Sequence, residues 1–341
     1  MKTIYALLMC ICLFACTKTV TEDVIRNTPA ELPSASHIYY SYKAEEVIDA
    51  GKLGYDPGMF TPDCTYIYGD TLFIANTQSG YLSLDLYSLS AHKKIKEFTR
   101  WTYNGNTEQF SGRIQAISVD HGVLYVANEG SCIDVFDVRT LKFITRIGNR
   151  NWGAGTTQFL HTHAMAIMGN YIIVRMKNRI QVMLQSEVSA EKYQNISFYS
   201  RGNSDIGVNN GFASHQMAID STGRVFLTDY VQQKIQVIDT ALIKKGDNIN
   251  ITTGQTIQLG FSPQGIALYK NLMYISGGDG SIRIYDRNKK EVITAFKSVP
   301  GYTISNAQKL LVHNNQLWIT DIAAKKIVRI DILPNKIEEY G

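Results

Sequence analysis

Val225-Phe226-Leu227-Thr228-Asp229, a turn, and Ile235-Gln236-Val237-Ile238-Asp239 make up the stretch that decides the fold of this chain. An apolar run containing an aromatic residue leads through a turn into an alternating strand that ends on Asp, which is the pattern of a β-hairpin. The pattern occurs six times, at residues 72–76 with 82–85, 124–128 with 133–137, 171–174 with 180–183, 225–229 with 235–239, 273–277 with 282–286, and 317–321 with 327–331. The third copy is degenerate, because its hairpin is shorter and lacks the Asp.

The copies recur at a regular interval. Phe73 and Trp318 are equivalent residues of the first and last copies, and five intervals separate them, so the mean period is 49 residues. Four short strands and their turns fit into a repeat of this length, which is the size of a propeller blade. We therefore predict an all-β fold, a single six-bladed β-propeller over residues 37–341 with four-stranded antiparallel blades. A strand at 38–47 is expected to close the ring, beside or in place of one at 337–340.

Residues 1–15 have the features of a secretory signal. Lys2 precedes an apolar run at 4–15, and these roughly 12 residues are fewer than the roughly 20 that a membrane-spanning helix needs. Cys16 follows Leu13-Phe14-Ala15, which resembles the lipobox of bacterial lipoproteins, in which the Cys becomes the acylated N-terminus. Residues 16–36 are then a flexible tether. The resemblance implies a cell-envelope protein held by lipid at the outer membrane, with either side of that membrane left open.

Composition and charge exclude several classes of protein. A hydrophobic content of 45% can fill a core, and a net charge of +4 is too weak to bind nucleic acid by bulk charge. Of the five Cys, Cys10 and Cys12 leave with the signal and Cys16 carries lipid, so Cys64 and Cys132 alone stay with the folded domain. A disulfide framework is therefore excluded. One bond between these two remains open, but we expect unpaired thiols because they fall on different repeats.

The connections between the repeats resemble those of NHL propellers. The glycine-rich stretch 148–159 with 164–167, the stretch 211–239 and the stretch 260–267 are similar to the lead-in and first strand of NHL repeats, and 124–148 resembles a YVTN repeat. Together with the lipobox, the chain resembles the six-bladed NHL-like or TolB-like propeller lipoproteins of the Bacteroidota. The resemblance implies the fold, but such propellers include both enzymes and scaffolds, so it leaves the function open.

A ring of equivalent residues is expected at one mouth of the central channel, because the first strand of each blade lines that channel. Aligning the repeats to within about one residue places in this ring Asp63, Arg113, His163, His215, Pro263 and Asn306. This polar ring is the candidate ligand-binding site. In an enzyme, Arg113 would hold an anion and Asp63 would act as a base.

Three histidines raise a second hypothesis. His161, His163 and His215 are candidate ligands for a divalent metal such as zinc, since a three-His site leaves one position for water or substrate. NHL-like amidating lyases hold a channel metal with His, so the resemblance implies a metal-dependent lyase or hydrolase as the alternative function. In the competing interpretation, these side chains bond to loop backbones and no cofactor is bound.

Three aromatic residues fall outside the repeating aromatic positions. Trp101, Tyr103 and Trp152 lie among polar residues and glycines, where a ring at the channel mouth would stack on a sugar or anchor a peptide. A loop that folds over its own aromatic residue explains them equally well. The sequence as a whole favours a monomeric, non-catalytic binding or scaffold module whose partner is a protein, a peptide or a glycan.

Overall fold

The computed structural model describes residues 40–78, 80–148, 158–159, 161–176, 179–187, 195–200, 216–243, 247–248 and 255–334. The features assigned above to Cys16, Trp152 and His215 lie outside these residues. Within them, no helix has the length and apolar character needed to cross a membrane.

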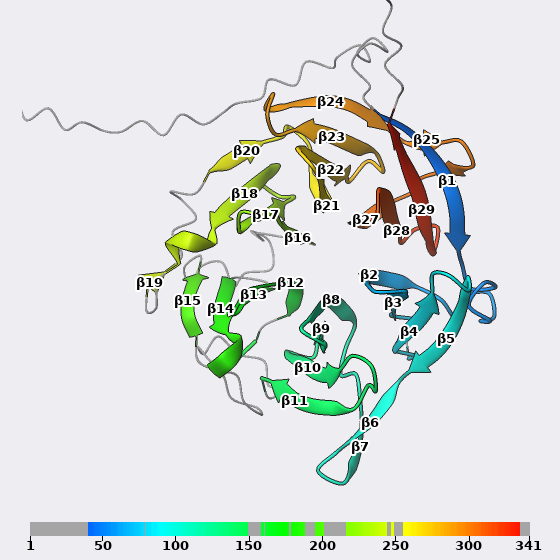
Figure 1. Ribbon diagram of the computed structural model, residues 1–341, viewed down its shortest axis with the longest axis vertical. Coiled ribbons are helices and arrows are strands. Elements are labelled where there is room, and N and C mark those ends of the chain that lie inside the picture. Colours follow the sequence, from blue (N-terminus) through cyan, green and yellow to red (C-terminus); the bar gives the residue numbers. More distant parts are fainter. Residues whose placement is uncertain are drawn as a thin grey trace, which may run out of the picture.

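Six sheets stand around a common axis, as predicted (Figure 1). The first three blades consist, from the axis outward, of β2 (Pro62–Tyr68), β3 (Thr71–Asn76), β4 (Ser83–Ser88) and β5 (Lys93–Phe98); β8 (Ile114–Asp120), β9 (Val123–Asn128), β10 (Cys132–Asp137) and β11 (Phe143–Ile147); and β12 (Thr162–Met168), β13 (Tyr171–Met176), β14 (Arg179–Leu184) and β15 (Asn195–Ser200). A fifth strand, β19 (Asp247–Asn248), runs parallel to β15 and is an addition to the predicted blade.

The other three blades follow in the same order. They consist of β16 (Met217–Ile219), β17 (Arg224–Asp229), β18 (Lys234–Asp239) and β20 (Thr256–Gln258); β21 (Pro263–Tyr269), β22 (Leu272–Gly277), β23 (Ile282–Asp286) and β24 (Glu291–Phe296); and β27 (Ala307–His313), β28 (Gln316–Asp321), β29 (Lys326–Pro334) and β1 (Tyr40–Ile48). Two small hairpins, β6 (Arg100–Tyr103) with β7 (Asn106–Gln109) and β25 (Ser298–Val299) with β26 (Tyr302–Thr303), join blades.

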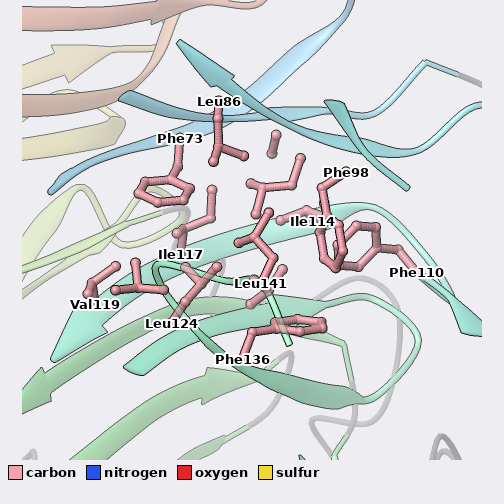
Figure 2. Close-up of a cluster of buried hydrophobic side chains, with 14 of the residues drawn as sticks. Phe73, Leu86, Phe98, Phe110, Ile114, Ile117, Val119, Leu124, Phe136 and Leu141 are labelled. Carbon is pink, nitrogen blue, oxygen red and sulfur yellow. The ribbon is translucent and has the colours of Figure 1, made fainter. Parts of the chain in front are cut away.

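Apolar side chains fill the spaces between adjacent blades, because both faces of each sheet are covered. Figure 2 shows one such cluster, in which Phe73 and Leu86 of the first blade lie across from Leu124 and Phe136 of the second. This double-sided packing explains why the second strand of each blade reads as an unbroken apolar run. Cys64 and Cys132 are both buried thiols that form no disulfide, as expected.

The ring closes where β1 pairs with β29, so the closing strand predicted at 38–47 is confirmed as β1. A β-bulge between Ala44 and Glu46 leaves Glu46 aimed at the first blade. Its carboxylate accepts from the Tyr87 hydroxyl at 2.5 Å, and Oε1 lies 3.0 Å from Nδ1 of His92 and Oε2 3.5 Å from NH1 of Arg329. A polar network therefore joins the last blade to the first. The alternative strand at 337–340 lies outside the described residues.

Candidate functional site

The propeller axis contains a cavity of about 310 Å³ that is lined by all six innermost strands. Each of these strands is the edge strand of its sheet, so one side of its backbone is not paired within the blade. We call the end at which the innermost strands begin the upper mouth and the opposite end the lower mouth.

A ring of polar residues marks the upper mouth. Five innermost strands have an irregular register close to their first residue, where the inner strand carries an extra residue relative to its partner. A bulge of this kind redirects a side chain, and the redirected residues are polar in all five, namely Asp63, Gln115, His163, Gln264 and Gln308. Arg113 and Asn306 were aligned two residues too early, and Pro263 one residue too early, because the spacing of the repeats is not constant.

Asp63 and Arg113 of this region form an ion pair between the first and second blades. Asp63 is 1% exposed, and its Oδ2 accepts from Arg113 Nε at 3.1 Å and from Arg113 NH2 at 2.6 Å. Burial alone would lower the pKa of Arg113, but the Asp63 carboxylate outweighs it and raises that pKa. Each residue therefore neutralises the other, and an anion at Arg113 would have to compete with Asp63.

Gln115 extends this network along the second blade. Its Nε2 donates to Glu129 Oε1 at 3.0 Å and lies 3.4 Å from Asp63 Oδ2. Glu129 also lies 3.9 Å from NH1 of Arg113. The network thus links the start of β8 to the turn after β9.

Lys309 is a buried cation in the channel. It is 5% exposed, its Nζ donates to the Gln115 carbonyl, and Nζ lies 3.7 Å from Asp63 Oδ1. Since Lys309 belongs to the sixth blade and Gln115 to the second, the side chain reaches past the first blade.

Gln216 makes a second connection of this type. Its Oε1 accepts the backbone N–H of Ile266 at 3.0 Å and that of Leu310 at 2.8 Å, and its Nε2 donates to the Leu310 carbonyl. One amide from the fourth blade therefore bonds the inner edges of the fifth and sixth blades.

Three buried acceptors at the upper mouth have no hydrogen-bond donor among the described residues. They are Oδ1 of Asp63, Oε1 of Gln264 and Oδ1 of Asn306, which come from the adjacent first, fifth and sixth blades. The Asp63 atom still faces the Lys309 amine at 3.7 Å. A buried acceptor without a hydrogen bond costs about 1–3 kcal/mol. These atoms are therefore suited to accept hydrogen bonds from the donors of a bound molecule or from water.

His161 and His163 lie next to each other, with ring centroids 6.2 Å apart and ring planes inclined by 20°. The backbone at His161 has a φ of 47°, so this residue is not part of an extended strand as expected. No group of three or more His, Cys, Asp or Glu side chains gathers as metal ligands in the part of the chain that the structure covers. The third expected ligand, His215, lies outside that part.

Trp101 is not at the channel mouth, and its predicted position there is wrong. It belongs to β6, in the hairpin that extends from the outer rim in Figure 1, and it is 7% exposed among Phe98, Phe110 and Phe136. Tyr103 on the same strand packs on Phe143 at a centroid distance of 4.8 Å. Both rings thus complete the core between two blades.

Uncharged hydrogen-bonding groups dominate the chemistry of this region. Burial raises the pKa of the Cys64 thiol beside the channel to about 12, so it is protonated at neutral pH. The Asp63 carboxylate forms ion pairs with both Arg113 and Lys309, so these charges neutralise one another. The arrangement is suited to binding by hydrogen bonds.

Four glutamines of this site and Lys309 did not enter the ring inferred from the sequence. A signal was present, since a Gln lies within one residue of the start of four inner strands, in Gln115-Ala116-Ile117, Gln216-Met217-Ala218, Gln264-Gly265-Ile266 and Gln308-Lys309-Leu310. Lys309 also interrupts an otherwise apolar strand.

The comparisons with known proteins show the fold. No protein-family model and no curated protein matches the chain. The β-propeller domain of Cps50 (Swd1) from Myceliophteria thermophila is similar with a TM-score of 0.56 at 10% identity, over 85% of this chain and 99% of that one. The structure of U3-55K is similar with a TM-score of 0.55 at 11% identity, over 81% of this chain and 78% of that one. At such identities the likeness establishes a six-bladed β-propeller and says nothing of function.

Proposed function

We propose that the protein is a non-catalytic binding module of the cell envelope, anchored by lipid on Cys16, whose ligand binds on the propeller axis. A propeller fold is consistent with a binding or scaffold role. The outer membrane is the proposed location, and a protein, a peptide or a glycan is the proposed partner.

One observation carries this proposal. The axial cavity of about 310 Å³ lies at the lower end of the range of small-molecule pockets, about 300–1,000 Å³, and it combines apolar walls with a few converging polar groups. The polar groups of its lining include Gln115, Ser118 and Gln216. Above them, at the upper mouth of the channel, Asp63, Gln264 and Asn306 each have a buried acceptor atom without a hydrogen-bond donor. Binding is favoured over catalysis because the charged groups nearby are paired with one another.

The test is a binding measurement with matched variants. Full-length protein, Asp63→Asn and Asn306→Ala are compared for retention of glycan and protein fractions of the envelope, with Arg139→Ala in an exposed turn as the control. We expect a ligand that is retained by the wild type and the control and lost from both site variants. Equal retention by all four proteins would contradict binding of that ligand at the upper mouth.

The metal content of the protein distinguishes a non-catalytic binding module from a metal-dependent enzyme. Elemental analysis is performed on purified protein and on His163→Ala and His215→Ala. Stoichiometric zinc or another divalent metal in the wild type, lost from both variants, would contradict the non-catalytic proposal and favour a metal-dependent lyase or hydrolase. Metabolic labelling with a fatty-acid analogue, with Cys16→Ser as the control, tests the anchor separately.

A further inference from the structure

Two side chains cross the channel at one level. Six residues occupy equivalent positions on the six innermost strands. Each lies two residues before the residue that pairs with Phe73, or with the equivalent of Phe73 in the other second strands. They are Cys64, Ala116, Ala164, Gln216, Gly265 and Lys309. We call this set the upper ring. Gln216 and Lys309 are its only long members, and each reaches past a neighbouring blade to the backbone of the next, Gln216 to Leu310 and Lys309 to Gln115.

The remaining members of the upper ring are small, which makes room for these two side chains. Gly265 shows the constraint most clearly. A Cβ at this position would lie 3.1 Å from Gln216 Oε1, 2.8 Å from Ser276 Oγ and 2.9 Å from the Gln308 carbonyl oxygen. A side chain there would displace Gln216, so glycine at 265 and the crossing amide belong together. The upper ring therefore obstructs the channel below the upper mouth.

Mostly small side chains occupy the positions two residues further along each strand. We call these residues the lower ring, and each of them pairs with Phe73 or its equivalent in the adjacent second strand. They are Tyr66, Ser118, Ala166, Ala218, Ala267 and Leu311. Four of these six side chains are Ala or Ser, and all six residues line the cavity. The cavity thus extends below Gln216 and Lys309 toward the lower mouth, as far as Ile219 and Val312.

The lining of the cavity selects a neutral ligand. Lys309 is the only charged residue among the described residues that line it, and its charge is already opposed by Asp63. A buried charge without a partner is costly, so an ionic ligand is disfavoured. The inner edges of the strands, with Thr65 and Ser118, offer both donors and acceptors, and Met165, Met217 and Leu310 lie between them as apolar surface.

The geometry points to a neutral polyhydroxylated molecule of one ring, such as a monosaccharide, that enters through the lower mouth and lies beneath Gln216 and Lys309. Hydroxyl groups would bond to the strand edges, and the C–H faces of the ring would cover the apolar side chains. The volume is about twice that of the roughly 150 Å³ cavity that holds a benzene ring. This inference rests on the proposed axial binding and specifies the ligand and its route.

Calorimetric titration of the full-length protein tests the ligand class. The probes are glucose, galactose and N-acetylglucosamine, with glucuronate and glucosamine as their charged counterparts. We expect at least one neutral sugar to bind at least tenfold more tightly than either charged one. The absence of binding by every neutral sugar, or tighter binding of a charged one, would overturn the inference.

Cavity-filling variants test the location. Ala267→Leu and Ala166→Leu narrow the lower ring on two different blades, and Ala323→Leu makes the same change in an exposed turn of the sixth blade. We expect at least tenfold weaker sugar binding in both lower-ring variants and no change in Ala323→Leu, with thermal melting confirming that each variant is folded. Unchanged affinity in a folded lower-ring variant would overturn this location.

The route is tested by association rates. Val312→Trp crowds the lower end of the cavity, whereas Ala323→Trp does not touch it. Slower sugar association in Val312→Trp alone supports entry from below, and an unchanged rate contradicts it. If no neutral sugar binds but an envelope ligand is still lost with Asp63→Asn, this inference fails while the proposed function stands. If neither is seen, both fail.

Discussion

The side-chain amide of Gln216 on the fourth blade is paired with the backbone of Leu310 on the sixth. Its Oε1 accepts the Leu310 N–H at 2.8 Å and its Nε2 donates to the Leu310 carbonyl, as a neighbouring strand would. The same Oε1 accepts the N–H of Ile266 on the fifth blade. A single residue therefore satisfies the exposed edges of two innermost strands and holds three blades together.

Replacing this amide should cost stability. Gln216→Leu removes the acceptor of two backbone N–H groups, and we expect the free energy of unfolding to fall by about 1–3 kcal/mol. Urea denaturation at neutral pH measures it. Gln255→Leu, at an exposed position before β20, is the control and should change little. Equal stabilities of the two variants would show that the crossing amide contributes nothing.

Gly265 should tolerate no side chain. In Gly265→Ala the new Cβ would come within 3.1 Å of Gln216 Oε1 and closer to two other oxygen atoms, so we expect a loss of about 1–3 kcal/mol. Gly278→Ala is a matched control, since its nearest neighbour would lie at 3.6 Å. Thermal melting compares the two. A Gly265→Ala protein as stable as Gly278→Ala would contradict the close approach.

The junction between the last and first blades should weaken in acid. Burial alone raises the pKa of Glu46, but hydrogen bonds from Tyr87 and His92, together with Arg329, outweigh it and hold this pKa below 4.5. A carboxyl with a lowered pKa in the folded state stabilises above its unfolded pKa, and this stabilisation is lost as the pH falls through the folded value. We therefore expect the urea midpoint to drop between pH 5 and pH 3.

Glu46→Gln isolates this effect. The variant should be less stable at pH 7 by about 1–3 kcal/mol, because it loses the charge that faces His92 and Arg329. Its urea midpoint should also change less than that of the wild type between pH 5 and pH 3. Glu291→Gln, exposed on β24, should keep the pH response of the wild type. A wild-type pH response in Glu46→Gln would exclude this carboxyl as its source.

Trp101→Ala should unfold more easily. The ring stacks on Phe98 and packs against Phe110 and Phe136, and removing a buried aromatic side chain costs about 3–5 kcal/mol. Tyr230→Ala, on an exposed turn, is the control. Thermal melting gives the result. Unchanged stability with loss of an envelope ligand would instead support the binding role that the sequence left open.

The period of the sequence was sufficient to predict the architecture. Each repeat carries its own apolar second strand, from Leu72 to Trp318, so the number of blades follows from counting, and the closing strand follows from the need to pair β29. The site was predicted less well for a local reason. The spacing between repeats varies, so an approximate alignment placed Arg113, Pro263 and Asn306 in the ring. Counting back ten residues from Tyr125, Tyr274 and Trp318, as Asp63 precedes Phe73, gives Gln115, Gln264 and Gln308 instead.

The misplaced tryptophan has a different cause. Trp101 stands among polar residues, and local composition alone cannot distinguish an exposed loop from a short hairpin that folds its ring inward. The contacts with Phe98 and Phe136 come from two different blades, so they depend on the assembled propeller. Likewise, Gln216 and Lys309 act on strands about 94 and 194 residues away in sequence, which no local pattern reports.

A crystal structure of the protein soaked with the neutral sugar that binds most tightly tests axial binding most directly. We expect density for one sugar ring between Ser118, Ala218 and Ala267, beneath the Gln216 amide and the Lys309 amine. Only ordered water on the axis, with the sugar bound elsewhere on the propeller, would contradict the axial site.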